Sequence, residues 1–449
     1  MRSQYYDPEI FIHSLDGIDR ANHIVATYFM DDELPGEDFV DHFALIQAMA
    51  VEGSTGTWEK VAEDTEDVRR KLSGKMVGYF EIPTTPSASR RAAVVQLAFP
   101  IDAWIDNVPM MLLSIAGNCF AYSPKLRLLD VFIPHNLLSK FQGPKFGVPG
   151  IRQLLNIPER PLSLHIIKPK MGMTPQQVAD QCYQTALGGV DMMKDDEMTS
   201  DVYNSTADDR VRAVSESLEK AKAKTGRKPI YFVSITDEPR RIFDKAARLV
   251  ELGAQGLLVC YSAGLAVLRQ LAEDPAIKVP ILVHASHMIA AQPRISWPVF
   301  AKLARLCGGD LMLTPTYWSS IPMVSLEEGI RTAQLKLAPL EHIKPMFPMP
   351  CAGVYPGLAP ILIGEYGKDI VIPAGGGMLG HPDGYAAGAR AWQQAIAVTL
   401  SGEDFLAAAK KPENHELRRA LEKWGYIERP RTPWLRVAPK FHPKPIVFD

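Results

Sequence analysis

The feature that most constrains the fold is a rhythm that begins near residue 150. A short apolar, β-branched run is followed by a segment with helical periodicity, such as 174–189 or 240–254, and the pair then recurs. Eight strand-like runs occur, at 163–170, 189–197, 229–236, 255–262, 280–286, 310–316, 343–353 and 369–377. Eight such pairs in succession predict a (β/α)8 TIM barrel, with an open doubly wound sheet as the alternative.

The first 145 residues lack this rhythm. They hold a helical pattern at 37–53, after a Pro35–Gly36 turn signal, and strand-like runs at 23–30, 75–83, 92–100 and 126–134. A chain of 449 residues exceeds the length of about 250–300 at which single cores stop growing. We therefore expect an N-terminal α+β, ferredoxin-like domain at 1–145 and a barrel catalytic domain with a helical tail at 146–449. The Gly-, Pro- and Lys-containing segment 139–150 marks the junction.

The composition excludes several classes of binding partner and of structural site. Lys and Arg number 49 and Asp and Glu 51, a formal charge of −2, so no global basic field exists to attract nucleic acid or anionic lipid. The five cysteines show no CxxC spacing, which argues against a disulfide framework or a zinc site. No apolar stretch is long enough to span a bilayer, and the N-terminus lacks a signal pattern. We expect a cytoplasmic enzyme with a small-molecule substrate.

Four of the eight expected strands end in ionisable or glycine-rich groups, at the end of a barrel where catalytic residues lie. These groups are Lys168 and Lys170, then Lys194 with Asp195, Asp196 and Glu197, then His284, and finally Gly375, Gly376 and Gly377. Asp196 and Glu197 offer the hard oxygen ligands that Mg²⁺ prefers. Lys194 is then either a counter-ion or is converted into an anion, and a salt-bridge cluster without a metal is the alternative.

The other strand ends also allow two interpretations each. Lys168 and Lys170, two positions apart, are expected on one face of a strand, where like charge and burial would lower their pKa values and suit them to proton transfer. They could instead extend to solvent at the rim. His284 is a proton shuttle or a structural hydrogen-bonding group. The glycine run, ahead of a helix expected near Asp383, is a phosphate cradle or a tight turn.

Taken together, several motifs resemble those of the large chain of ribulose-1,5-bisphosphate carboxylase/oxygenase (RuBisCO), and more closely the non-carboxylating RuBisCO-like, or form IV, proteins. They occur in family order over most of the chain: EGSTGTW (52–58), SIAGN (114–118), FQGPKFG (141–147), IKPKMG (167–172), GGVDMMKDDE (188–197), GGD (308–310) and GGGMLGHP (375–382). The resemblance strengthens the barrel prediction.

The resemblance also implies roles. Lys194 would react with CO₂ to form a carbamate that binds Mg²⁺ together with Asp196 and Glu197. Lys168, Lys170 and His284 match catalytic positions, and Gly353, Gly375 and Gly376 match backbone phosphate contacts. The resemblance further implies a homodimer or a dimer of dimers without a small subunit, in which a second chain contributes to each site through residues that match Glu52, Thr57, Trp58 and Asn118.

Departures from the carboxylase pattern point to a different reaction. Ala285 replaces an arginine, Leu313 a histidine and Cys351 a serine, and the segment 314–329 lacks the lysine that orients CO₂ in carboxylases. Carboxylation should therefore be lost, while the metal residues and one phosphate cradle remain.

We expect Mg²⁺-dependent enolisation of a phosphorylated ketose or keto sugar acid, leading to isomerisation or to decarboxylation or C–C cleavage in carbohydrate catabolism, as with a 3-oxo-isoapionate 4-phosphate type substrate. One alternative is an enolase or isomerase of a methylthio-sugar phosphate in methionine salvage. The other is a non-catalytic regulatory homologue.

Overall fold

The computed structural model describes residues 7–33, 42–57, 61–83, 90–202, 204–319, 324–427 and 446. The chain divides into two compact units, one formed by residues 1–142 with 288–306 and the other by 143–287 with 307–449. The segment 288–306 groups with the first unit because backbone hydrogen bonds of 2.8 and 2.9 Å join Leu128 to Arg294 and Ser296.

The first unit is built on a four-stranded antiparallel sheet in the order β2-β3-β1-β4. Its strands are β1 (His23–Glu33), β2 (Lys75–Ile82), β3 (Arg90–Pro100) and β4 (Arg127–Phe132). Its main helices are α2 (His42–Glu52), α3 (Glu66–Leu72), α4 (Val108–Ala116) and α12 (Trp297–Leu306), with the short helices α1 (Pro8–Phe11), α5 (His135–Leu138) and α11 (Met288–Ala291). Strand order and connections match the predicted ferredoxin-like arrangement.

The second unit holds eight parallel strands in the order β11-β10-β9-β8-β7-β6-β5-β12, and β11 and β12 at the two ends of this series lie side by side. The strands are β5 (Leu162–Ile166), β6 (Met192–Lys194), β7 (Ile230–Ser234), β8 (Gly256–Cys260), β9 (Ile281–His284), β10 (Leu311–Pro315), β11 (Phe347–Cys351) and β12 (Val371–Ala374). The predicted TIM barrel is confirmed: seven strands lie inside the predicted runs, and β5 begins one residue before its run, at Leu162.

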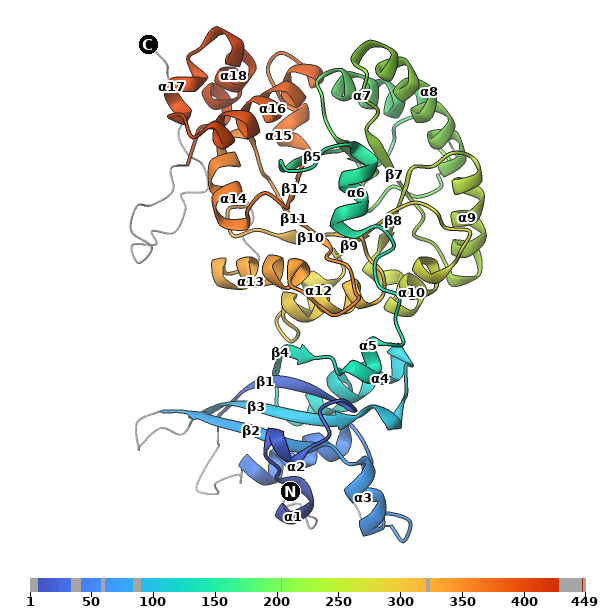
Figure 1. Ribbon diagram of the computed structural model, residues 1–449, viewed down its shortest axis with the longest axis vertical. Helices are drawn as coiled ribbons and strands as arrows, with labels where there is room; N and C mark the ends of the chain where they lie inside the picture. The colour runs from blue at the N-terminus through green and yellow to red at the C-terminus, as the bar shows by residue number, and fades with distance from the viewer. Residues whose placement is uncertain are drawn as a thin grey trace. The chain divides into compact units, whose positions relative to one another are not determined.

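Helices α7 (Pro175–Leu187), α8 (Ala207–Thr225), α9 (Pro239–Glu251) and α10 (Leu265–Glu273) lie outside the strands (Figure 1). Capping residues mark where they begin: Thr174 forms a capping box with Gln177 at the start of α7, and Thr206 caps α8. The remaining helices of this unit are α6 (Gly147–Leu155), α13 (Leu326–Leu337), α14 (Ala359–Tyr366), α15 (Gly376–Leu379), α16 (Tyr385–Ser401), α17 (Phe405–Ala409) and α18 (His415–Trp424).

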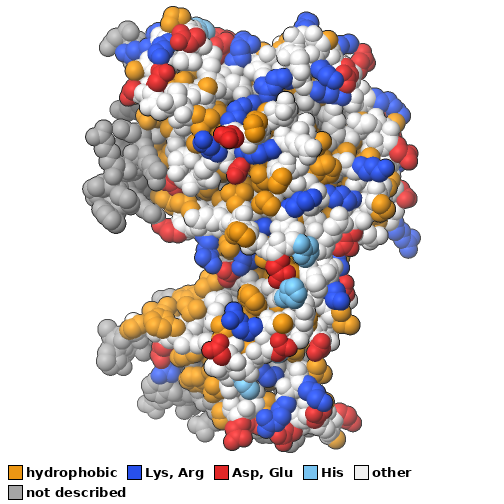
Figure 2. All heavy atoms as spheres, in the orientation of Figure 1, with side chains coloured by type: hydrophobic (Ala, Val, Ile, Leu, Met, Phe, Trp, Pro, Cys, Tyr) orange, Lys and Arg blue, Asp and Glu red, His pale blue; other side chains and the backbone are white. Residues whose placement is uncertain are grey.

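The barrel interior is filled by alternate residues of the strands, such as Leu162 and Leu164 of β5, Met192 of β6 and Leu311 and Leu313 of β10. The interior is therefore a packed core, and polar chemistry is confined to the strand ends. Among the described residues, no helix is both long and apolar enough to cross a membrane. Positive and negative side chains are interspersed over the face drawn in Figure 2.

Candidate active site at the carboxyl ends of the barrel strands

Lys194 is the last residue of β6, the strand between β5 and β7. Its register partners are Ile166 and Phe232. Because side chains alternate along a strand, Lys194 shares the inward face with Met192 of the barrel core. The side chain is fully buried, and its Nζ donates to the backbone oxygen of Asp195 at 2.9 Å. The Lys194 amine is thus buried at the carboxyl end of the apolar barrel core.

The three acids that follow Lys194 have different partners. Asp196 accepts a hydrogen bond from Lys168, and Glu197 accepts one from Lys170. Lys170 Nζ also lies 3.4 Å from Asp196 Oδ1. Asp195 instead accepts hydrogen bonds from Tyr231 Oη at 2.6 Å, from Arg210 Nε at 3.2 Å and from the Ser234 backbone N–H at 3.0 Å. Asp195 therefore supports the loop, whereas Asp196 and Glu197 face the lysines.

Two expectations are wrong, namely the place of both lysines on a strand face and the lowered pKa of Lys170. Strand β5 ends at Ile166, so both lysines lie in the loop beyond it rather than on a strand face. Burial alone would lower the pKa of Lys170, but its hydrogen bond to Glu197 and the charges of both acids together raise that pKa above the ordinary value. The carboxylates outweigh the repulsion that the sequence predicted. Gln181 of α7 fixes the loop, because it accepts from the Lys168 N–H at 3.2 Å and donates to the Lys168 carbonyl at 2.8 Å.

His284 ends β9 and joins the same cluster. Its Nε2 lies 3.5 Å from Glu197 Oε2, and its Nδ1 accepts a hydrogen bond of 3.3 Å from the Ser286 N–H. Burial, and then the charge of Lys194, holds the pKa of His284 well below its ordinary value. The ring is therefore neutral at neutral pH. His287 is exposed, apart from the barrel core.

The residues present fit a Mg²⁺ ion only if Lys194 contributes. No group of three or more His, Cys, Asp or Glu in the described part of the chain is arranged to hold a metal. However, the buried Asp196 Oδ1 accepts no hydrogen bond, and Glu197 lies beside it. Burial lowers the pKa of Lys194, which favours the neutral amine, the form that can attack CO₂. Two carboxylates plus a carbamate oxygen make a donor set that suits Mg²⁺.

The glycine run follows β12, which pairs with β5. A Cβ on Gly375 would lie 3.3 Å from Lys168 Cε, so this glycine is next to a lysine of the cluster. A Cβ on Gly377 would lie 1.9 Å from the Val354 carbonyl oxygen, so that glycine is required by packing. A Cβ on Gly376 would meet nothing within 4 Å. The helix expected near Asp383 is preceded by α15, which begins within the run. Gly353, after β11, has a φ of +67°.

In the first unit, Glu52 at the end of α2 accepts hydrogen bonds from Asn118 Nδ2 at 3.1 Å and from Tyr122 Oη at 3.2 Å. Two residues that the resemblance assigns to one function therefore lie together. Thr57 is half-buried, and Trp58 lies outside the described residues.

The positions that depart from the carboxylase pattern are apolar and enclosed. Ala285 and Leu313 are both buried, and Cys351 is half-buried. Sequence reasoning missed Lys336 of α13, which is fully buried and donates to the Met312 carbonyl at 2.9 Å and to Thr314 Oγ1 at 3.2 Å. Burial lowers the pKa of Lys336 to about 7. Its only sequence signal is a lysine between leucines in an otherwise ordinary amphipathic helix.

Comparisons with known proteins agree with this architecture. Residues 15–137 match the family model of the ribulose bisphosphate carboxylase large chain, N-terminal domain, and residues 147–424 match its catalytic domain. A ribulose bisphosphate carboxylase-like protein of Archaeoglobus fulgidus is 38% identical over 91% of this chain and 94% of its own length. A 2,3-diketo-5-methylthiopentyl-1-phosphate enolase of Geobacillus kaustophilus is 32% identical over 90% of this chain and 98% of its own.

A solved octameric ribulose-1,5-bisphosphate carboxylase/oxygenase from Pyrococcus horikoshii has the same fold. It superimposes with a TM-score of 0.83 at 31% identity, covering 92% of this chain and 96% of that one. The chain therefore belongs to the ribulose bisphosphate carboxylase large-chain family, as its motifs predict, and its relatives include RuBisCO-like proteins and enolases.

Proposed function

We propose that the protein catalyses Mg²⁺-dependent enolisation of a phosphorylated ketose or keto sugar acid. One observation carries the proposal: Lys168, Lys170 and His284 converge on Asp196 and Glu197, beside the buried Lys194. A cluster that combines proton-transfer groups with two hard ligands suits removal of a proton next to a carbonyl.

Asp196, Glu197 and a carbamylated Lys194 would hold the metal. When bound, Mg²⁺ supplies polarisation of the substrate carbonyl and stabilises developing negative charge. Lys168, Lys170 or His284 would move the proton. His284 is held neutral, which is the form of a general base, whereas Lys170 is held charged, which is the form of a general acid. Gly375 and Gly376 offer backbone N–H groups for a phosphate, next to Lys168.

A second candidate is supported by a relative. The Geobacillus protein is named as an enolase of a methylthiopentyl phosphate. The buried Ala285 and Leu313 would suit an apolar substrate tail. Both candidates share enolisation and differ in the group beyond the reacting carbons, so the decarboxylation or isomerisation outcome depends on the substrate.

We further propose that the active unit is a homodimer or larger, in the cytoplasm, with Glu52 and Asn118 of a partner chain completing each site. The octameric assembly named for the Pyrococcus relative supports association. Carboxylation of ribulose bisphosphate is not expected, because the segment 314–329 carries no lysine to orient CO₂.

The test is solvent deuterium incorporation into a panel of phosphorylated keto sugars, keto sugar acids and 2,3-diketo-5-methylthiopentyl-1-phosphate. We expect exchange with at least one compound, dependent on Mg²⁺ and bicarbonate and absent in Lys194→Ala. The surface variant Lys278→Ala is the matched control and should exchange normally. Exchange that persists in Lys194→Ala, or no exchange with any compound, would contradict the proposal.

A further inference from the structure

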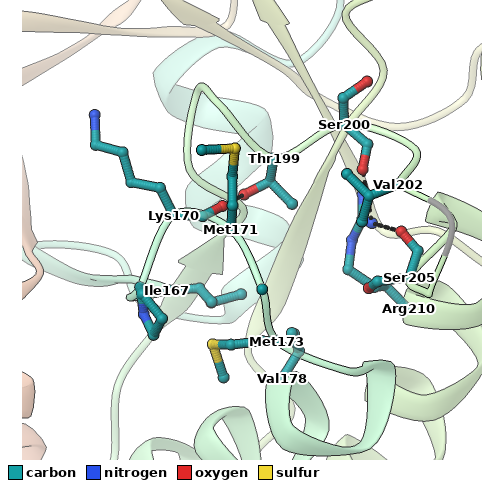
Figure 3. A pocket seen from close by; sticks show the side chains of 12 residues that line it. Ile167, Lys170, Met171, Met173, Val178, Thr199, Ser200, Val202, Ser205 and Arg210 are labelled. Atoms are coloured by element: carbon teal, nitrogen blue, oxygen red, sulfur yellow. Dashed lines mark hydrogen bonds between the residues drawn. The ribbon is translucent and has the colours of Figure 1, made fainter.

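A crevice lies between the loop that follows β5 and the loop that follows β6. The space between the loops is about 320 Å³ when the part open to solvent is included. Apolar groups dominate its walls, among them Ile167, Met171, Met173, Val178 and Val202. In Figure 3 the Lys170 side chain extends away from Met173 and Val178. Lys170 lines the crevice as well, so the crevice borders the cluster of proposed reacting groups.

At the floor of the crevice, two buried polar atoms of the described lining residues have no hydrogen-bond partner, Ser205 Oγ and Arg210 Nη2, although Arg210 Nη2 lies 3.1 Å from Asp195 Oδ2. Ser205 is 3% exposed, and its Oγ has no hydrogen-bond partner in the described structure. Arg210, also at the floor, donates to the Ser205 carbonyl at 2.7 Å and to the Ser200 carbonyl at 3.2 Å, and Asp195 balances its charge. A buried hydroxyl without a partner costs free energy that a ligand atom can recover. With the charges already paired, the matching ligand is neutral.

Thr199 links the crevice to the cluster. Its Oγ1 donates to the Lys170 carbonyl at 2.9 Å and accepts from the Asp196 N–H at 3.2 Å. One hydroxyl thus joins the loop that carries Lys170 to the loop that carries Asp196 and Glu197. A molecule packed between these loops would hold the same two backbones at this separation.

We propose that the crevice is an effector site for a small neutral molecule with an apolar chain and one terminal hydrogen-bonding group. Its occupancy tightens metal binding by fixing the two loops through Thr199. The coupling rests on the proposed Mg²⁺ function, whereas binding in the crevice does not. Because coupling is reciprocal, Mg²⁺ must tighten binding of the effector by the same factor.

The probe is 1-butanol, with butane-1,4-diol as the ligand control because it lacks an apolar end. Spectra of ¹³C-methyl methionine report on Met171 and Met173, assigned by replacing each with leucine. We expect saturable shifts of both methyl signals with 1-butanol. Val202→Phe, which fills the crevice, should abolish them, and Leu400→Phe on the exposed end of α16 should not. Ser205→Ala keeps the shape and should weaken binding about threefold to tenfold.

The coupling is measured on the same samples. We expect 1-butanol to tighten Mg²⁺ binding in the presence of bicarbonate about fivefold, in wild type and not in Val202→Phe. Absent shifts, shifts that survive in Val202→Phe, or a soaked crystal with only ordered water in the crevice would overturn the site. Saturable shifts with unchanged Mg²⁺ affinity would overturn the effector role. A protein that binds no Mg²⁺ would refute the proposed function, while the methyl shifts still decide the site.

Discussion

Two buried aspartates flank strand β6: Asp191 directly precedes it, and Asp196 lies two residues beyond its end. Their hydrogen-bond and ion-pair partners differ. Asp191, at the amino end, is held by Arg160 Nη1 at 2.7 Å, Arg160 Nη2 at 2.6 Å, Arg227 Nη2 at 2.6 Å and the Ser163 N–H at 2.8 Å. Asp196, at the carboxyl end, has one oxygen that accepts no hydrogen bond, and lysines rather than arginines face it.

The difference contrasts a network that holds the fold with the cluster that we propose for the chemistry. Arginine binds a carboxylate with a rigid fork and stays charged, so the amino-end network has one stable state. Lysine is a flexible point charge whose protonation changes readily on burial. The carboxyl end can therefore exchange its ammonium partners for a cation or a substrate. Under this proposal, two aspartates five positions apart have different tasks because their basic partners differ.

The largest expected effect is at the carboxyl end. Lys194→Ala should lower metal-dependent turnover by at least about a thousandfold, because the carbamate oxygen is lost, and should change the free energy of unfolding by no more than about 2 kcal/mol. Deuterium exchange and thermal denaturation measure the two quantities. Wild-type activity should also rise after preincubation with bicarbonate and Mg²⁺. If activity does not change when CO₂ is removed, the carbamate is contradicted and the metal site would consist of Asp196 and Glu197 alone.

The opposite pattern is expected at the amino end. Asp191→Asn should destabilise the protein by about 2–4 kcal/mol, since Arg160 and Arg227 lose their anion, with the partial exposure of both arginines reducing the cost. Turnover per folded molecule should stay near the wild-type value. Urea denaturation with activity titration tests this, with the exposed Asp244→Asn as control. A stable but inactive Asp191→Asn protein would remove the contrast between the two ends.

A smaller effect, on the pH dependence of stability, is expected at His165 of the neighbouring strand β5. Its ring bonds Gln181 Oε1 at 3.0 Å and Thr185 Oγ1 at 3.1 Å, and burial lowers its pKa to about 4. Between about pH 6.5 and pH 4, His165 is protonated in the unfolded chain and neutral in the folded chain. Stability is therefore complete above about pH 6.5 and is lost as the pH falls toward 4, by up to about 3 kcal/mol.

The measurement is the free energy of unfolding against pH for wild type, His165→Asn and the exposed His415→Asn. Only His165→Asn should lose this part of the acid slope. Parallel curves for all three proteins would assign the acid sensitivity to other groups.

Much of the molecule could be predicted from the sequence because the patterns that specify it lie within short stretches of the chain. Alternating apolar runs predicted every barrel strand, and the rule that sites lie at the carboxyl ends of strands brought Lys168, Lys194 and His284 together. What failed depended on distant partners. The sequence named Asp196 rather than Asp195 as a ligand, but it could not show what Asp195 does, because that role depends on Tyr231 and Arg210. Nor could it show that carboxylates raise the pKa of Lys170, or that Lys336 is buried.

The brevity of β6 has a consequence for how this protein can change. Three residues separate Asp191 from Asp195, and their side chains alternate between barrel interior and helix layer. Inserting or deleting one residue there would turn Lys194 toward the helices and a methionine toward the site. This segment can tolerate replacements but no change of length, so new reactions must arise in the loops beyond the strands, where length is free to vary.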